Sequence, residues 1–147
     1  MESTGGGRMK KYIGTKIIEA EPREGADRRE GYKVIYKDGY SSWSPKEAFE
    51  EAYVALDSIP NKLSVEAIES KIAKTDLLRV PDTTTTICVL HLENGYVVTG
   101  NSACIDPKEF SEEIGASIAY ENALNKVWEL EGYLLAQRRF EAGLTKE

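Results

Sequence analysis

The feature that most constrains this chain is an Asn-Gly pair at residues 94–95, between two runs of alternating, largely β-branched residues. Both residues of such a pair tolerate the positive φ angles that a type I′ turn requires. The runs 84–92 and 96–105 therefore predict a β-hairpin at the centre of the fold. Most positions on both faces of the first run are apolar, which is typical of a strand covered on both sides.

A long helix is expected directly after this hairpin. Asp106-Pro107-Lys108-Glu109 combines a capping carboxylate, a proline at the first helical position and an acidic first turn. The helix is then expected to continue to Gly132, where we expect a break, and residues 137–147 read as a polar tail. Its apolar stripe consists of Phe110, Ile114, Ile118, Ala119, Ala123, Val127 and Leu130.

A smaller copy of this arrangement precedes it. The strands 32–36 and 40–43 are joined by Lys37-Asp38-Gly39, and an Asp-Gly pair favours a tight turn for the same steric reason. Ser44-Pro45-Lys46-Glu47 then starts a helix that we expect to run from Pro45 to Leu56. The β-branched segment 11–20 predicts one more strand, so this part should hold about three strands and one helix.

The domain organisation follows from the breaks between these elements. Residues 1–10 read as a flexible extension, and residues 57–63 read as a linker that contains Pro60. Ser64 caps a second helix, predicted over Val65–Lys74, and residues 77–80 form a continuation or an irregular bridge. The prediction is an α+β protein of two small modules, each a β-hairpin or small antiparallel sheet followed by a proline-started helix. The modules span residues 11–57 and 64–136.

Composition excludes several classes of protein. With 41% hydrophobic and 30% charged residues, the chain is typical of soluble proteins. It has no apolar run near the ~18 residues that span a membrane, and its start has no apolar stretch typical of a secretory signal. We therefore expect an intracellular protein that does not contact membranes. The net charge of −6 disfavours long nucleic acid as a partner, although a small anion in a local basic pocket remains compatible with it.

The residue types needed for catalysis are scarce. The chain has no glycine-rich phosphate loop, no Ser-His-Asp order and no metal-ligand spacing. Cys88 and Cys104 flank the hairpin and read as free thiols, and His91 reads as a structural residue of a strand. Cys104 and His91 could act as a thiol and base only if the hairpin brought them together. We expect no enzyme, no metal and no cofactor.

Two groups of residues are candidates for ligand binding. The first surrounds the smaller hairpin, where aromatic faces could stack on a base and cations could meet phosphates. Core packing and cross-strand pairing are the alternative explanation for its aromatic residues. The second group precedes the long helix, whose free amides could meet an anion, with capping and turn formation as the alternative. The candidates are Arg28, Tyr40, Trp43 and Lys46 in the first group, and Asn101 and Ser102 in the second.

The second half of the chain resembles a known family. The run Thr86-Ile-Cys-Val-Leu-His-Leu-Glu-Asn-Gly-Tyr-Val-Val-Thr-Gly-Asn-Ser-Ala-Cys is followed by Phe110, Glu113-Ile-Gly, Val127-Trp128 and Gly132-Tyr133-Leu134. Over residues 64–135 this pattern closely resembles a small tailed-phage family of unknown function, typified by gene product 66 of a Shigella phage. The resemblance implies a phage or prophage origin and assigns no catalytic residues.

The first half of the chain resembles a different module. Residues 11–20 and 31–47 look like a segment found at the start of several short phage proteins. They are similar to the N-terminal part of phage sponges that sequester cyclic ADP-ribose signals of the Thoeris defence. The chain departs from those sponges because it lacks their C-terminal helical hairpin.

These resemblances and the candidate residues lead to one functional hypothesis. We expect a phage-encoded, non-enzymatic, homo-oligomeric anti-defence protein that binds and sequesters a small nucleotide immune signal in the cytoplasm of the infected bacterial host. The alternative is a phage protein that inhibits a host or defence protein by direct binding, which the acidic balance would suit. A structural or accessory virion protein is a third class.

Overall fold

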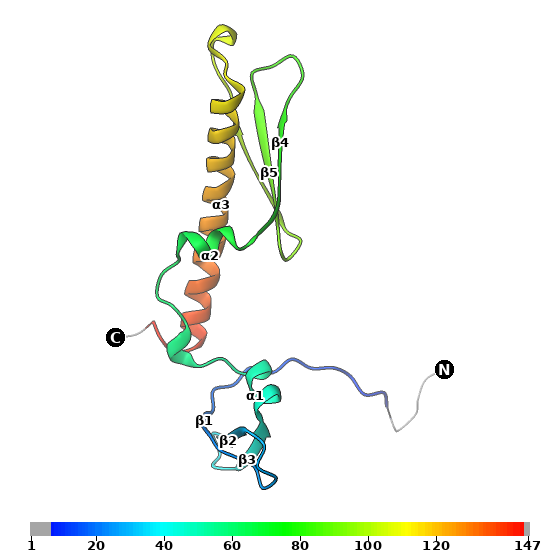
Figure 1. The fold of residues 1–147 in the computed structure, drawn as a ribbon, viewed down its shortest axis with the longest axis vertical. Coiled ribbons are helices and arrows are strands. Elements are labelled where there is room, and N and C mark those ends of the chain that lie inside the picture. The colour runs from blue at the N-terminus through cyan, green and yellow to red at the C-terminus, as the bar shows by residue number, and fades with distance from the viewer. Residues whose placement is uncertain (1–6, 146–147) are drawn as a thin grey trace. The chain divides into compact units, whose positions relative to one another are not determined.

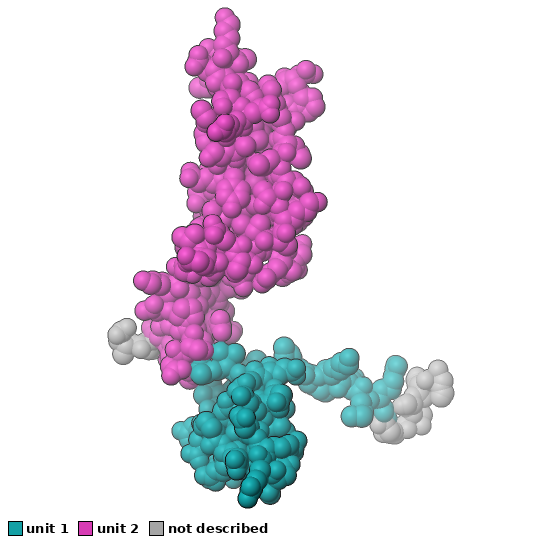
Figure 2. Space-filling model, viewed as in Figure 1, with its two compact units in different colours: residues 1–55 teal, residues 56–147 magenta. Residues whose placement is uncertain are grey.

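The computed structural model describes residues 7–145, and the chain divides into two compact units, residues 1–55 and 56–147 (Figures 1 and 2). Each unit contains a three-stranded antiparallel sheet, and the second ends in a long helix. The predicted α+β class with two small sheets is therefore confirmed. No helix within residues 7–145 has the length and apolar composition needed to cross a bilayer.

The first unit is built on the smaller hairpin. Its strands are β1 (Glu19–Pro22), β2 (Gly31–Ile35) and β3 (Ser41–Pro45), paired in the order β1-β2-β3. The predicted Asp-Gly turn joins β2 to β3, and Gly39 takes the positive φ of +91° that favours glycine. Helix α1 (Lys46–Ala52) follows β3.

The small core of this unit is partly aromatic. Val34 of β2 is 1% exposed. The ring of Phe49 in α1 stacks on Tyr32 with ring centroids 4.0 Å apart, and Tyr53 stacks on Phe49 in turn. Helix α1 is therefore held against β2 by stacked rings, an arrangement that stabilises beyond area burial alone.

Two sequence predictions for the first unit are wrong. Most of the expected strand 11–20 is irregular, because nothing covers Tyr12 and Ile13, which are 88% and 95% exposed. Strand propensity without a pairing partner is not enough to form a strand. The helix expected over Pro45–Leu56 is shorter, because Pro45 still belongs to β3 and Tyr53 is extended. Of the extension predicted for residues 1–10, residues 1–6 lie outside the described part.

The second unit holds the larger sheet. Its elements are the 3₁₀ turn Leu56–Ser58, helix α2 (Val65–Glu69), strands β4 (Ile72–Arg79), β5 (Thr86–Leu92) and β6 (Val97–Ser102), the 3₁₀ turn Pro107–Glu109, and helix α3 (Glu112–Glu141). The sheet order is β4-β5-β6, with both pairs antiparallel. The central hairpin is confirmed, since Gly95 has a φ of +91° and the Asn94 side chain accepts a 2.9 Å hydrogen bond from the amide of Tyr96.

The helix predicted over Val65–Lys74 is wrong in its second half. Helix α2 ends at Glu69, and the chain then becomes the eight-residue strand β4. Ile68 is buried in the core and anchors the short helix. Residues 72–79 pair with β5 along their length, and this non-local pairing overrides the helical spacing of the sequence.

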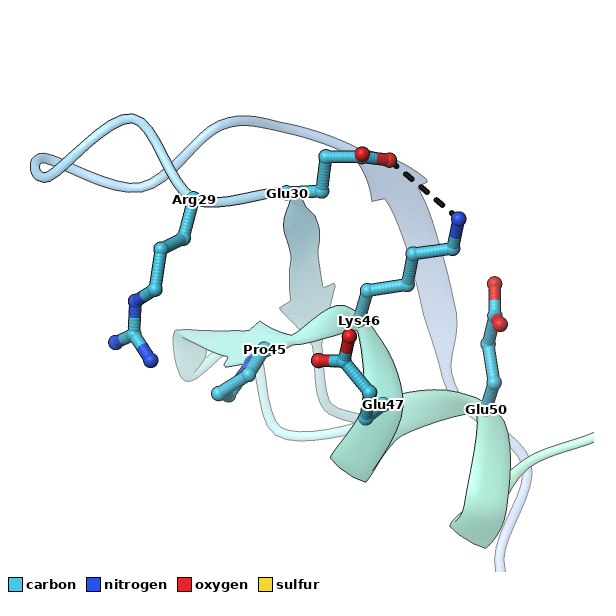
Figure 3. A pocket seen from close by; sticks show the side chains of 6 residues that line it. All are labelled: Arg29, Glu30, Pro45, Lys46, Glu47 and Glu50. Carbon is cyan, nitrogen blue, oxygen red and sulfur yellow. Dashed lines mark hydrogen bonds and ion pairs between the residues drawn. The ribbon is translucent and has the colours of Figure 1, made fainter.

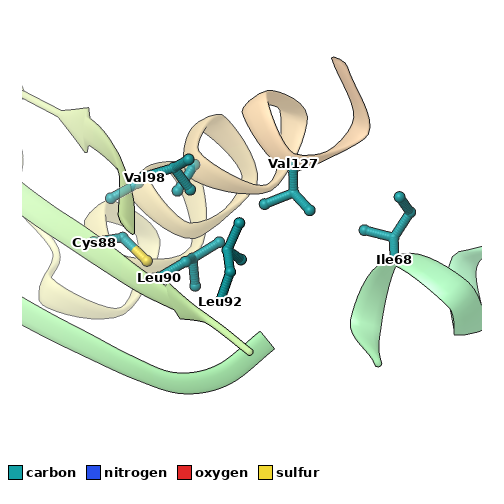
Figure 4. Packing of buried hydrophobic residues seen from close by; sticks show 8 residues of the cluster. Ile68, Cys88, Leu90, Leu92, Val98 and Val127 are labelled. Atoms are coloured by element: carbon teal, nitrogen blue, oxygen red, sulfur yellow. The ribbon is translucent and has the colours of Figure 1, made fainter. Parts of the chain in front are cut away.

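Helix α3 covers one face of β5 and β6. Buried Cys88 and Leu90 of β5 alternate with half-buried residues that point to the other face. From α3, Ala119, Ala123 and Val127 are fully buried against them, and Figure 4 shows Val127 beside the strand residues and Ile68. Within residues 56–145 no helix packs on the other face, so within this unit the expectation that β5 is covered on both sides is wrong.

The boundaries of α3 also differ from the prediction. Pro107 starts only a 3₁₀ turn, and the helix begins at Glu112 with Ser111 as its cap, so the second module is not proline-started. The Ser111 hydroxyl accepts a 3.2 Å hydrogen bond from the amide of Ile114. Gly132 does not break the helix, which continues to Glu141, so the segment expected to be a polar tail is helical up to there.

Candidate functional site

A hollow of the first unit lies where β2 begins and β3 ends. It has a volume of about 270 Å³, and Figure 3 shows that its lining side chains come from the loop before β2, the end of β3 and helix α1, with Glu30 and Lys46 reaching toward each other. A second hollow of about 440 Å³ is also lined by Glu30, Lys46 and Glu50, and its lining includes Tyr32 as well. The first hollow is lined by Arg29, Glu30, Pro45, Lys46, Glu47 and Glu50.

Lys46 lines both hollows and makes two contacts with Glu30, the residue directly before β2. Its ammonium forms an ion pair of 3.4 Å with Glu30, drawn in Figure 3, and its amide donates to the Glu30 carbonyl at 3.1 Å. The negative charge of Glu30 raises the pKa of Lys46 above its usual value. Lys46 is thus a cation held in place at the hollow, and its role in ligand binding stays a prediction.

Glu50 is fixed by a tyrosine. The Tyr32 hydroxyl donates a 2.7 Å hydrogen bond to the Glu50 carboxylate, and this bond raises the pKa of Tyr32. Because the Tyr32 ring also stacks on Phe49, the carboxylate is held by the core of the unit. Glu50 can therefore accept hydrogen bonds from a ligand at a defined place.

Trp43 organises the loop beside the hollow. Its indole nitrogen donates to the Arg23 carbonyl at 2.8 Å, and its ring packs on Gly25 and Gly31, where a Cβ would collide with it. The Arg29 guanidinium lies over the indole, 5.4 Å from the ring centre. Trp43 thus takes the packing role weighed as the alternative, and it positions Arg29 by a cation–π contact.

Arg29, and not Arg28, is the arginine that lines the hollow. Arg28 occupies the left-handed region with a φ of +66° in the turn that precedes β2. Arg29 pairs with Asp27 at 2.5 Å, and its amide lowers the pKa of that carboxyl. The candidate predicted from the sequence was Arg28, and Glu30, Glu47 and Glu50 were not predicted.

The other predicted site residues lie elsewhere. Tyr40 stacks on Tyr36 at the opposite end of β3 from Lys46, and a strand of five residues spans about 16 Å. Asn101 and Ser102 belong to β6 in the second unit. The Ser102 hydroxyl donates to the Gly115 carbonyl at 2.6 Å, and the Asn101 carbonyl accepts from the Asn122 side chain at 2.8 Å. Both residues thus bind α3.

The thiol and imidazole of the second unit have separate partners. His91 Nε2 lies 2.9 Å from Asp76 Oδ2, and Cys104 Sγ donates to the Asp106 carbonyl at 3.1 Å. The hydrogen bond from His91 lowers the pKa of Asp76, and burial raises the pKa of the Cys88 thiol. Within residues 7–145 no group of three His, Cys, Asp or Glu side chains is placed to hold a metal ion.

Comparison with known proteins defines the second unit as that of a bacteriophage protein. Residues 50–139 match the model of the Phage protein (N4 Gp49/phage Sf6 gene 66) family. The match covers more than half of the chain, so the protein belongs to this family. It runs from within α1 to within α3, and of the residues that line the first hollow it includes only Glu50. No curated protein and no solved structure matches the chain.

Proposed function

We propose that this phage protein is a non-enzymatic anti-defence protein that binds and sequesters a small nucleotide signal of host immunity in the cytoplasm of the infected cell. The observation that carries the proposal is the hollow at the end of the first sheet, where Arg29 and Lys46 lie among three glutamates. The similarity of residues 11–20 and 31–47 to the N-terminal part of Thoeris sponges supports it from the sequence.

The mixed charge of the hollow suits a nucleotide with few phosphates. A phosphate accepts charge-assisted hydrogen bonds from Arg29 and Lys46, while ribose hydroxyls and a base amino group donate to glutamates such as Glu50. Three carboxylates against two cations disfavour a ligand with many negative charges. The volume of about 270 Å³ is near the lower end of the ~300–1,000 Å³ of small-molecule sites, so it holds about one nucleotide unit.

Equilibrium binding tests this proposal. A panel of cyclic dinucleotides, cyclic trinucleotides and cyclic ADP-ribose isomers is titrated into the full chain by calorimetry. One member should bind at micromolar concentration or tighter, and Arg29→Ala should weaken it about tenfold or more, because a hydrogen bond to a charged group is lost. Arg28→Ala is the matched control, since it removes the same charge one residue away and should change affinity less than twofold.

Two outcomes would count against the proposal. If no member of the panel binds at micromolar concentration, sequestration of such signals is excluded. If Arg28→Ala and Arg29→Ala weaken binding equally, the affinity depends on the net charge of the protein, and the ligand does not bind in the hollow beside Trp43.

Direct binding to a host or defence protein is the second candidate function. It is favoured by the uncovered face of the second sheet, where Ile87 and Val89 are half-buried, and Leu78 and Val97 are 50% and 44% exposed. Exposed apolar patches of this kind are typical of protein interaction sites. A protein that is captured from infected lysate by the wild-type chain and by Lys46→Ala, but not by Val97→Lys, would favour this function over sequestration.

A further inference from the structure

Strand β4, at one edge of the second sheet, presents an unpaired edge. It has eight residues and is the longest strand in the described part of the chain, and it pairs with β5 on one side only. Six of its eight residues are exposed. An edge of this length displays a row of free amide and carbonyl groups, which makes it a template for another strand.

The opposite edge of the same sheet, β6, makes contacts with helix α3. At β6, Gly100 lies directly against the backbone of α3 at Ala119 and Ala123. The Asn122 side chain donates a hydrogen bond of 2.8 Å to the Asn101 carbonyl of that strand. Helix α3 therefore packs on the face of β6 and binds one carbonyl of that edge, whereas within residues 56–145 no strand pairs with the outer side of β4.

Of the usual protections against edge pairing, β4 has charged side chains at Lys74, Asp76 and Arg79. It contains no proline, and its one irregularity is a bulge between Ile72 and Lys74. Leu77 and Leu78 are 48% and 50% exposed, on opposite faces of the sheet beside the open edge. Another strand placed along this edge would cover both side chains.

We propose that β4 of one molecule pairs antiparallel with β4 of a second copy, about a two-fold axis at Thr75, so that two sheets join into one sheet of six strands. The choice of partner follows from charge. A two-fold axis perpendicular to the sheet places the same face of both copies on the same side. Because side chains alternate between the two faces along a strand, each residue lies opposite its own counterpart or a residue an even number of positions from it. With Thr75 on the axis, Lys74 lies opposite Asp76 of the second copy, and Asp76 lies opposite its Lys74.

The neighbouring registers lack this complementarity. An axis at Asp76 places two aspartates opposite each other, which is repulsive. An axis at Leu77 places Asp76 opposite Leu78. Before Lys74 the register is interrupted by the bulge, since Ile72 pairs with Leu92 and Lys74 with His91. Of the three registers compared, only that of Thr75 places opposite charges against each other.

Within one molecule, the side chains of Lys74 and Asp76 are already held close to the positions that the pairs with the second copy require. Lys74 and Asp76 lie on the face away from α3, and their charged atoms are 3.7 Å apart. His91 Nε2, at 2.9 Å, holds the Asp76 carboxylate on this face. Strand pairing over so short a segment covers less than the ~1,200–2,000 Å² of a standard interface, so the dimer is weak and depends on concentration.

Disulfide trapping tests the register. Two residues opposite each other on the axis have Cβ atoms about 4.5–5.5 Å apart, within reach of a disulfide after small adjustment. In a Cys104→Ser background, Thr75→Cys should give a covalent dimer under mild oxidation, whereas Leu77→Cys should give no covalent dimer. No covalent dimer at residue 75, or efficient trapping at residue 77 in its place, would overturn the proposal.

Sedimentation of the full chain tests the charge argument independently. The wild type should show a reversible monomer–dimer equilibrium, and Lys74→Glu should weaken it about fivefold or more by placing like charges opposite each other. The double variant Lys74→Glu/Asp76→Lys should restore dimerisation. Lys126→Glu, which makes the same charge change on α3, should leave it unaltered. A wild type that stays monomeric at millimolar concentration, or a double variant as weak as the single one, would refute self-pairing.

Discussion

Replacement of Gly100 by alanine should destabilise the second unit more than the same replacement at any other glycine in its sheet or in helix α3. A Cβ at Gly100 would meet the Ala123 amide nitrogen, and would lie 2.6 Å from the Ala119 carbonyl oxygen and 2.8 Å from Ala123 Cα. All three atoms belong to the backbone of α3, so none can rotate away. The φ of Gly100 is not positive, so the cost is steric and not conformational.

The size of the effect follows from how far α3 must move. Ordinary Cβ contacts begin at 3.4 Å, so the helix must retreat by about 0.8 Å from the carbonyl contact alone. A gap of that width forfeits about a quarter to a half of the attraction between the atoms it separates, here those of Leu90 and Val98 against α3. We expect a loss of about 3 kcal/mol, the upper end for overpacking. For a unit of this size the melting temperature should fall by about 12 °C or more.

Two other glycines provide matched controls, because each accepts the same methyl group on α3. At Gly115 the nearest atom is the Thr86 hydroxyl at 2.9 Å, which belongs to a side chain, so the cost should be intermediate. At Gly132 the nearest atom is Leu63 Cδ1 at 3.9 Å, so alanine should stabilise the helix by up to about 1 kcal/mol. Urea unfolding and calorimetry measure all three variants. A Gly100→Ala protein that melts within a few degrees of the wild type would refute the reasoning.

Two further predictions concern titratable groups of the second unit. In the native protein a thiol reagent should modify Cys104 quickly and Cys88 only after unfolding, because Cys88 is buried and burial raises its pKa; two fast thiols in the native state would contradict this. The pKa of Asp76 is lowered by the hydrogen bond from His91, so its contribution to stability is present above the usual value of 3.8 and is lost as the pH falls through the lower native pKa. Asp76→Asn should flatten the dependence of unfolding free energy on pH below about pH 4, and an unchanged acid slope would show that the hydrogen bond contributes nothing.

The turns could be predicted from the sequence because their causes are local. Asn94-Gly95 and Asp38-Gly39 each favour a tight turn whatever lies around them, and both glycines take positive φ angles in the structure. The strand β4 was missed for the opposite reason. The spacing of Val65, Ile68 and Ile72 is helical, and only pairing with β5, far along the chain, decides that residues 72–79 are extended.

The candidate site shows the same division between local and non-local causes. Lys46 follows a turn and a helix start that are both visible in the sequence, and it lines the hollow. Whether Arg28 or Arg29 lines the hollow depends on which side chain reaches the Trp43 ring. A shift of one residue in the loop before β2 would exchange the two arginines. Glu50 becomes a site residue only through its hydrogen bond with Tyr32, a contact that no spacing rule predicts.

The two proposals concern different parts of the chain, so each can be tested by a variant that leaves the other property unchanged. The family match over residues 50–139 contains all of β4 and its partner β5, but only Glu50 of the residues that line the first hollow. Self-pairing through β4 therefore rests on the segment shared with the phage family, whereas ligand binding rests on the module before it. Lys74→Glu should weaken dimerisation and leave nucleotide binding unchanged, whereas Arg29→Ala should weaken nucleotide binding and leave dimerisation unchanged. If Lys74→Glu also removed ligand binding, the hollow would be complete only in the dimer, and sequestration would depend on the shared segment after all.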